Sequence, residues 1–368
     1  MTPIRVVHAQ GEPAQRGREI GRSLGDLIER SLAFYQGYLE RRGIAAAQLE
    51  EYLTPHLRAA AQTLPEYVEM IRGLAAGAMA SFWEVFAVNA FEELDPLFPP
   101  EAFSFLDRTV GRSGPDGWSG RRPLDRCSSF AVSGEGFSLL GHNEQWLAGD
   151  QGNVAVVIEH PDDGSPAIAS PTVVCCLPAV GMNEHRGAQA IQSLAASDDR
   201  PGVPRVLVSR HSLGAADRVD AVGRATIPGR AGGYGHLFAF PGDAFIVETT
   251  AKRHSLLSGS GPHTNHYLDP ALAEFAEPPS AGSAARYARL LELIEERRPD
   301  TPEAVMGILK DHGGEPQSIC LHADEEAGEE GEGILFSMVC DVEAGRMWVA
   351  PGNPCVTPYE QIGLAGVV

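Results

Sequence analysis

The sequence has few basic residues, no long apolar run and few aromatic residues. Lys and Arg together number 29 against 49 Asp and Glu, which leaves a formal charge of −20 over 368 residues. A surface of that sign repels polyanions, so we expect no nucleic-acid partner. No stretch approaches the roughly 18 apolar residues of a membrane-spanning helix, and the first residues lack the apolar core of a signal peptide. We therefore expect a cytoplasmic protein that does not bind membranes.

Glycine-rich phosphate loops and dinucleotide fingerprints are also absent from the sequence, and we expect no cofactor. Aromatic residues make up 7% and are spread thinly, so no acyl-binding pocket stands out. The chain has six cysteines: Cys127, Cys175, Cys176, Cys320, Cys340 and Cys355. In a chain of this size without an export signal, the ordinary expectation for a cysteine is a reduced, buried thiol.

The first third of the chain has a helical pattern. Residues 4–10 predict a strand, and apolar residues at steps of three and four then predict helices over 13–42, 45–62, 65–79 and 83–94. A stripe of glycines in the first helix predicts close approach of a second backbone: Gly17, Gly21 and Gly25. Residues 109–124 are rich in Gly, Arg, Pro and Ser, a composition typical of a surface linker.

From Cys127 onward the pattern changes to short strands. Gly134-Glu135-Gly136 separates two alternating runs and predicts a hairpin. Helices are expected over 204–213, from about 216, over 282–297 and over 302–311, and the last strands over 318–321, 335–340 and 347–349. Segregated helices and antiparallel strands, without regular βαβ alternation, predict sheet layers covered by helices.

The stretch Asp125-Arg126-Cys127-Ser128-Ser129-Phe130 lies where the two patterns meet. Cutting the Arg126–Cys127 bond would make an internal thiol N-terminal and place a free α-amino group on the same residue. Because such an amine has a pKa of roughly 7.7–8.0, much of it can be neutral near physiological pH. It could then act as general base for its own thiol. Cys127 is therefore our candidate nucleophile.

Further motifs extend along nearly the whole chain: Gly11-Glu12-Pro13, Val88-Asn89-Ala90, Gly141-His142-Asn143, Gly181-Met182-Asn183-Glu184-His185, Gly202-Val203-Pro204-Arg205, Thr264-Asn265-His266-Tyr267, Ser318-Ile319-Cys320-Leu321-His322 and Gly352-Asn353-Pro354-Cys355. In order and spacing, together with Cys127-Ser128-Ser129, they resemble the autoproteolytic acyltransferase and hydrolase family typified by acyl-coenzyme A:6-aminopenicillanic acid acyltransferase, a branch of the N-terminal-nucleophile hydrolases. The resemblance implies a mixed α/β fold, a four-layer αββα sandwich with a helical N-terminal segment.

The resemblance also implies that the precursor cuts itself between Arg126 and Cys127. Fragments 1–126 and 127–368 would remain together as an internal heterodimer and one globular unit. Cys127 would form a thioester acyl-enzyme, and Asn265 would supply an oxyanion-hole amide. The substrate would be a small-molecule amide or acyl thioester. Water as acceptor makes an amidase and an amine makes an acyltransferase; the net charge of −20 favours amide hydrolysis over a coenzyme A thioester.

Four more residues are candidates for lining the site: Ser128, Asn143, Gln145 and His266. Ser128 could assist the amine, whereas Asn143 could instead hold the second strand against the first and His266 could be a packing histidine. The chain differs from the family pattern at two places. It has Arg126 where the family usually has glycine, and Gln145 where the family commonly has aspartate.

Two other classes of function stay open. The chain could be a binding or scaffold protein of the same fold, if Arg126 blocks self-cleavage; intact mass separates this reading. It could also be a metal-dependent hydrolase that uses His263, His266, Cys320 and His322. The pair His263 and His266 and the pair Cys320 and His322 lack the tight spacing of a structural zinc site, so we expect no metal. Metal analysis would distinguish a metal-dependent hydrolase from the other two classes.

Overall fold

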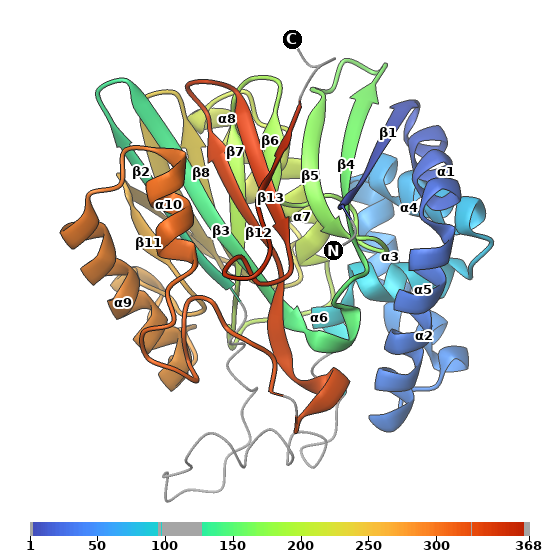
Figure 1. Cartoon of the computed structure of the whole chain (residues 1–368). Helices are drawn as coiled ribbons and strands as arrows, with labels where there is room; N and C mark the ends of the chain where they lie inside the picture. Colours follow the sequence, from blue (N-terminus) through green and yellow to red (C-terminus); the bar gives the residue numbers. More distant parts are fainter. Residues whose placement is uncertain (1–2, 95–96, 98–126, 325, 364–368) are drawn as a thin grey trace, which may run out of the picture.

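The computed structural model describes residues 3–94, 97, 127–324 and 326–363, and its two β-sheets stack face to face with helices outside them (Figure 1). The helices are α1 Pro13–Ser23, α2 Gly25–Arg41, α3 Leu49–Thr63, α4 Pro65–Ala78, α5 Phe82–Asn89, α6 Phe91–Leu94, α7 Arg205–Leu213, α8 Arg218–Ala225, α9 Ala281–Arg297 and α10 Pro302–Leu309. The strands are β1 Arg5–Gly11, β2 Cys127–Gly134, β3 Phe137–Leu147, β4 Val154–Pro161, β5 Ile168–Val173, β6 Gly181–Asn183, β7 Ala188–Leu194, β8 Gly233–Phe240, β9 Asp243–Thr249, β10 His254–Ser258, β11 Gly261–His263, β12 Glu332–Asp341, β13 Arg346–Pro351 and β14 Glu360–Ile362.

The larger sheet has eight strands in the order β1-β4-β5-β6-β7-β8-β9-β10, and the smaller has six in the order β11-β2-β3-β12-β13-β14. Strand β1 pairs with β4 in parallel, with Arg5 opposite Ala155, so the N-terminal segment is part of the larger sheet. The predicted hairpin at Gly134-Glu135-Gly136 is confirmed, and it joins β2 to β3 with Cys127 opposite Glu144. Gly136 has φ +80°, a conformation that favours glycine.

Four groups of buried apolar side chains separate the layers. One lies between the sheets and includes Ala131 and Leu140 from the smaller sheet and Val156 from the larger. A second joins the outer face of the smaller sheet to α9 and α10, around Phe130 and Leu293. The other two cover the larger sheet, one with α1–α5 and α7 and one with α8. The predicted αββα arrangement is therefore confirmed, since each sheet has a helical layer outside it.

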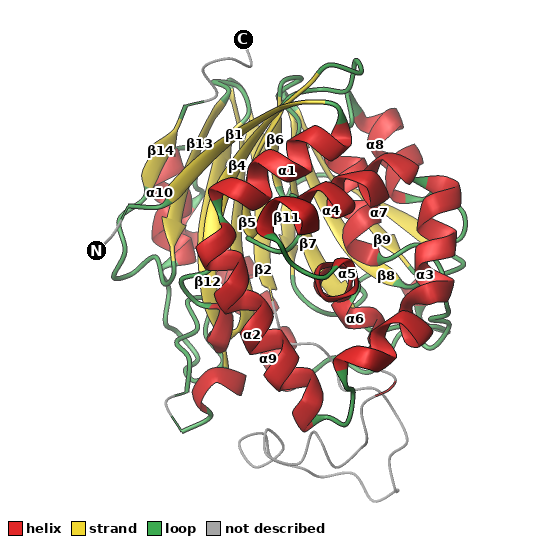
Figure 2. Ribbon diagram, turned by 90° about the vertical axis from the view of Figure 1, so that its right-hand side faces the viewer, coloured by secondary structure: helices red, strands yellow, loops and turns green. Residues whose placement is uncertain are grey.

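Helices α1 and α4 lie side by side (Figure 2), and their backbones approach closely at glycines of both helices. A Cβ atom on Gly17 would lie 2.1 Å from the Met70 carbonyl oxygen, which is far inside contact distance. The same close approach occurs from both helices, at Gly17, Gly21, Gly73 and Gly77. The prediction from the glycine stripe is confirmed for its first two members. It is wrong for Gly25, which has nothing within 4 Å of an added Cβ.

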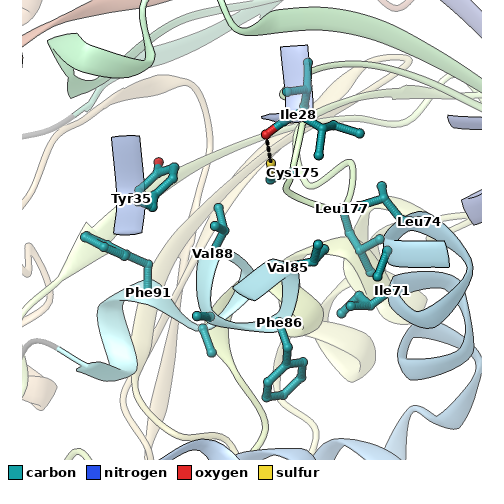
Figure 3. Close-up of a cluster of buried hydrophobic side chains, with 14 of the residues drawn as sticks. Ile28, Tyr35, Ile71, Leu74, Val85, Phe86, Val88, Phe91, Cys175 and Leu177 are labelled. Atoms are coloured by element: carbon teal, nitrogen blue, oxygen red, sulfur yellow. Dashed lines mark hydrogen bonds between the residues drawn. The ribbon is translucent and has the colours of Figure 1, made fainter. Parts of the chain in front are cut away.

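Apolar side chains of α2, α4 and α5 surround the chain segment that follows β5 (Figure 3). Cys175 lies in this segment, and its thiol approaches the Ile28 carbonyl oxygen at 3.8 Å. Val85 and Phe86 are fully buried in the same cluster. The cluster joins residues before position 127 to residues after it, so both parts of the chain contribute to one core.

Several predicted boundaries are wrong. The helix expected over 13–42 is interrupted at Leu24, which has φ −116° and ψ 13°, and that expected over 83–94 is interrupted at Ala90. Residues 318–321 form no strand. The Ile319 carbonyl oxygen accepts from the Asn143 side-chain amide, and the Leu321 carbonyl oxygen accepts both from the Asn353 side-chain amide and, at 3.4 Å, from a single N–H of β12. The expected linker over 109–124 and Arg126 lie outside the described residues. Among the helices described, none is long and apolar enough to cross a bilayer.

Candidate active site

Cys127 is the first residue of β2, inside the smaller sheet between β11 and β3, and only 2% of it is exposed. Its backbone N–H donates to Asn265 Oδ1 at 2.9 Å, and its carbonyl oxygen accepts from Arg286 Nη1 at 2.6 Å. The structure thus brings together Cys127 and Asn265, the two predicted catalytic residues. Hydrogen bonds on both sides of the Cys127 Cα fix the direction in which its thiol leaves the strand.

Arg286 belongs to this site although the sequence analysis missed it. Its Nη1 also donates to Ser128 Oγ at 2.8 Å, and its Nη2 donates to Asn265 Oδ1 at 3.1 Å. The side chain is buried, at the position in α9 where an apolar residue would be expected between Ser283 and Leu290. Lys and Arg are almost never fully buried without partners. A basic residue on the buried stripe of an amphipathic helix was the signal that could have found it.

Glu144 lies opposite Cys127 on β3, and its Oε1 is 3.7 Å from the Cys127 thiol. Its Oε2 lies 2.9 Å from His142 Nε2, and the other ring nitrogen of His142 is 2.7 Å from Ser129 Oγ. Gln192 Nε2 donates to the same hydroxyl at 2.6 Å. A chain of hydrogen bonds therefore extends from the carboxylate beside the thiol to β7 of the larger sheet.

Burial raises the pKa of the Cys127 thiol well above its usual value, and the negative charge of Glu144 raises it further. The backbone N–H of Gln145 and the charge of Arg286 act in the opposite direction and lower that pKa, but burial is the larger effect. With its amide nitrogen still bonded to the preceding residue, Cys127 therefore carries a protonated thiol at neutral pH. Any attack by its sulfur requires a base to take this proton.

The remaining predicted residues differ in where they lie. Ser128 contacts Arg286, and Gln145 reaches the thiol through its backbone amide. His266 Nδ1 lies 2.8 Å from Ser283 Oγ, which accepts the Asn265 backbone N–H, so this path from His266 to Cys127 has three contacts.

Asn143 lies on the other face of the sheet, because side chains alternate along a strand. Its Nδ2 donates to the carbonyl oxygens of Leu309 and Ile319 at 2.9 Å each. Its side chain therefore holds the segment after α10 and lies away from the thiol. The sequence analysis considered a structural role in which Asn143 holds the second strand against the first, whereas these contacts join β3 to the region of α10 instead.

A mostly apolar cavity of about 80 Å³ lies beside Glu144, between the N-terminal helices and the larger sheet. Five aromatic residues that are scattered in the sequence meet here: Tyr35, Phe91, Trp146, Tyr234 and Phe336. The sequence marked no obvious pocket, because the fold concentrates aromatics that the sequence disperses. Glu92 and Glu93 also line the cavity, and Arg205 Nη1 binds Glu93 at 2.8 Å.

The four residues of the alternative metal site do not meet. His263 Nε2 lies 2.8 Å from Glu248 Oε1, and its Nδ1 lies 2.6 Å from the Thr264 carbonyl oxygen. Among the described residues, the groups with ligand atoms close enough for a metal are Cys127 with His142 and Glu144, and a separate group of His312, Cys320, His322 and Cys355. His263 and His266 belong to neither, so the predicted four-residue site is wrong.

A cysteine that opens an inner strand, in two stacked sheets with helices on both outer faces, defines the class of N-terminal-nucleophile hydrolases. The family described as acyl-coenzyme A:6-aminopenicillanic acid acyl-transferase matches residues 132–355, which include Asn265 and Arg286. The chain belongs to this family.

A curated relative matches over nearly the whole chain, and solved structures match over shorter parts. The chain is 24% identical over 361 residues to the acyl-coenzyme A:6-aminopenicillanic-acid-acyltransferase 40 kDa form of Emericella nidulans, across 95% of this chain and 92% of that one. Penicillin V acylase from Agrobacterium tumefaciens is a structural neighbour with 14% identity and a TM-score of 0.41, covering 61% of this chain and 83% of its own. A mutant of conjugated bile acid hydrolase from Clostridium perfringens has 13% identity and a TM-score of 0.33, covering 64% of this chain and 96% of its own.

Proposed function

We propose that the chain cuts itself between Arg126 and Cys127 and then uses Cys127 as an N-terminal nucleophile on amides. The observation that carries this proposal is the anchoring of Cys127 at the start of β2, with its N–H on Asn265 Oδ1 and its carbonyl on Arg286. The same contact would hold a free α-amino group beside its own thiol after cleavage. Self-cleavage, the nucleophile and the role of Asn265 are all parts of this proposal.

Self-cleavage begins with attack of the Cys127 sulfur on the Arg126 carbonyl carbon. Glu144, with Oε1 3.7 Å from the thiol, takes the proton as the new C–S bond forms. The C–N bond to Cys127 then breaks, the amine receives that proton, and a thioester joins Arg126 to the sulfur. Water hydrolyses the thioester and leaves a carboxylate on Arg126 and a free thiol on Cys127.

The mature cycle uses the α-amino group as base. This group accepts the thiol proton while the sulfur attacks the substrate carbonyl, and it returns the proton to the departing amine. Asn265 Nδ2 donates to the Ser193 carbonyl oxygen at 3.2 Å, which orients the amide. An amide nitrogen carries two hydrogens, and we assign one of them to the oxyanion of the transition state. The buried charge of Arg286 strengthens this stabilisation. Water completes the second step in an amidase, and an amine completes it in an acyltransferase.

The cavity beside Glu144 favours an acyl group that is apolar and uncharged. Apolar side chains surround most of it, whereas Glu92, Glu93 and Glu144 give it negative charge that Arg205 balances only in part. A carboxylate on the acyl group would lose its hydration and meet charges of the same sign. We therefore place the substrates among amides of apolar carboxylic acids, and hydrolysis ahead of transfer from coenzyme A thioesters.

The first test is the intact mass of the denatured protein, with N-terminal sequencing of each fragment. We expect two chains, the larger beginning with Cys127. Cys127→Ala should stay uncut and inactive, whereas Cys340→Ala, which removes another buried thiol, should be cut like the parent. An uncut parent chain would favour the binding-protein alternative, and full activity in Cys127→Ala would overturn the nucleophile.

The second test compares amides that share one leaving amine. Amides of a monocarboxylic acid should react faster than those of a dicarboxylic acid of equal length. We expect a ratio of about ten or more in kcat/KM, because a factor of ten corresponds to about 1.4 kcal/mol. Equal rates would remove the role given to the acidic residues, while leaving the nucleophile intact.

A further inference from the structure

Two loops on the outer side of the smaller sheet carry a second group of cysteines and histidines, separate from Cys127. His312, Cys320 and His322 lie between α10 and β12, and Cys355 lies between β13 and β14 (Figure 1). The first three come from a segment that the sequence analysis wrongly expected to contain a strand. Only Cys320 and His322 are close in the sequence, so the fold is what brings the four together.

The ligand atoms of these four residues converge on one point. All of them lie within 4.8 Å of one another. His322 Nε2 lies 3.2 Å from His312 Nε2 and 3.2 Å from Cys355 Sγ. In tetrahedral zinc, bonds of about 2.0–2.1 Å to nitrogen and about 2.3 Å to sulfur place the ligand atoms roughly 3.3–3.8 Å apart. The two spacings from His322 Nε2 are close to those of a zinc site.

Hydrogen bonds around the group fix its ligands in place. The buried Asn353 side chain donates from Nδ2 to Cys320 Sγ at 3.6 Å and to the Leu321 carbonyl oxygen at 2.7 Å. The Cys320 backbone N–H donates to the Asp311 carbonyl oxygen at 2.9 Å. Asn143 holds the same segment through Ile319. Residues that orient metal ligands in this way are a regular part of protein metal sites.

We propose that His312, Cys320, His322 and Cys355 bind one structural Zn²⁺ ion. Two thiolates and two imidazoles are a ligand set that selects zinc in tetrahedral geometry. Binding releases one proton from each thiol, and the two thiolates balance the charge of the ion. Four protein ligands leave no open position for a substrate, so the ion joins the two loops and takes no part in the reaction at Cys127.

The position of the site suggests what the ion supports. Asp311, next to His312, forms two hydrogen bonds with Arg289 of α9, at 2.9 and 2.8 Å. Arg286, which holds the Cys127 carbonyl, lies one turn earlier on that helix. The metal would therefore fix the loop against which the outer face of α9 is held.

The test measures metal in the full chain, expressed without a polyhistidine tag. Elemental analysis should find zinc in a one-to-one ratio with protein. After removal of zinc, added Co²⁺ should bind with the same ratio and give the absorption of tetrahedral cobalt bound to thiolate. Cys355→Ser and His322→Ala should lose the metal. Asn353→Ala should weaken binding by about 10- to 100-fold, as changes next to metal ligands do.

Matched controls separate this site from the one around Cys127. Cys127→Ser should keep its zinc, as should Cys176→Ser, a part-buried thiol elsewhere, and His254→Ala, an exposed histidine. Loss of metal in Cys127→Ser with retention in Cys355→Ser would move the ion to Cys127, His142 and Glu144 and overturn the proposal. Protein without zinc that gives no cobalt–thiolate absorption, or a count of four free thiols from a Cys320–Cys355 disulfide, would also overturn it.

Discussion

The molecule holds two groups of cysteine and histidine that differ in what surrounds the sulfur. Around Cys127 there is one thiol, a carboxylate 3.7 Å away, a buried arginine and an apolar cavity beside them. Around Cys320 there are two thiols and two histidines with their ligand atoms facing one another. A single thiol beside a base and a cavity suits bond making and breaking, whereas four converging ligands suit a bound ion. In our two proposals, the same residue types would serve chemistry in one place and architecture in the other.

Arg286 offers the largest test of this contrast, because it is the buried charge on which the first group depends. Arg286→Ala leaves the Cys127 carbonyl and Asn265 Oδ1 without their guanidinium donor. We expect kcat/KM to fall by about 10²–10³, or roughly 2.7–4 kcal/mol, because the nucleophile and the oxyanion donor Asn265 would both lose the group that positions them. Steady-state kinetics, with melting temperature measured in parallel, provide the check.

Arg289 is the matched control, one turn further along α9 and partly exposed. Its ion pair with Asp311 lies at the surface of the helix, so Arg289→Ala should cost at most about 1 kcal/mol of stability. Turnover should change little. Equal losses of kcat/KM in the two variants would mean that Arg286 acts only by keeping α9 folded.

Loss of stability in acid limits the pH range in which the Cys127 group and the Cys320 group can be compared, because both groups need the folded sheets. Burial lowers the pKa of His236 to about 3 and that of His211 to about 4. Between about pH 6.5 and these values, the unfolded chain binds protons that the folded chain does not. The free energy of unfolding should therefore fall as pH drops through that range, by at most about 1.4 kcal/mol per pH unit for each histidine.

Denaturant unfolding at a series of pH values measures this slope. His236→Phe keeps a ring between Tyr234 and Phe238 but removes the titrating nitrogen. The variant should therefore have a shallower slope below pH 6.5 than the parent. An unchanged slope would show that other groups, such as His211, account for the acid sensitivity.

Replacing Ser128 should give the smallest effect, and it tests one hydrogen bond of Arg286 apart from the others around Cys127. Its hydroxyl accepts one hydrogen bond from Arg286, which has other acceptors nearby. Ser128→Ala should cost about 1 kcal/mol, or roughly fivefold in kcat/KM. Ser133→Ala, on the same strand near the hairpin, is the control and should match the parent. A loss as large as that of Arg286→Ala would give the hydroxyl a direct role in the reaction.

The sheet layers covered by helices, and the change from helices to strands at Cys127, were predictable because both depend on local sequence pattern. Helical periodicity before Cys127 and strand alternation after it are properties of neighbouring residues, and both are confirmed. The strand expected over 318–321 is wrong: Ser318, Ile319 and Cys320 are buried in succession, and Ile319 belongs to the core beneath α9 and α10. The spacing of apolar residues indicates which side chains are buried, but it does not indicate which groups form hydrogen bonds with the backbone.

The site was predictable only where a motif carried it. Cys127 and Asn265 lie in recognisable segments and meet in the structure. Arg286 was missed although its place on the buried stripe of α9 was a local signal. Glu144 was missed because its role arises from pairing across strands, which no local spacing records. For the same reason the sequence paired Cys320 and His322 with the wrong histidines. Their partners, His312 and Cys355, come from flanking loops.

The contact between α1 and α4 has a consequence for how this protein can evolve. Where two backbones touch, a mutation cannot be absorbed by a neighbouring side chain changing its rotamer. Gly17, Gly21, Gly73 and Gly77 each face a carbonyl oxygen within 2.3 Å of an added Cβ, so even alanine would force the helices apart. These four positions should therefore stay glycine, whereas the apolar residues around them can be exchanged for others of similar volume. A part of the molecule that takes no part in the chemistry is then among the least free to vary.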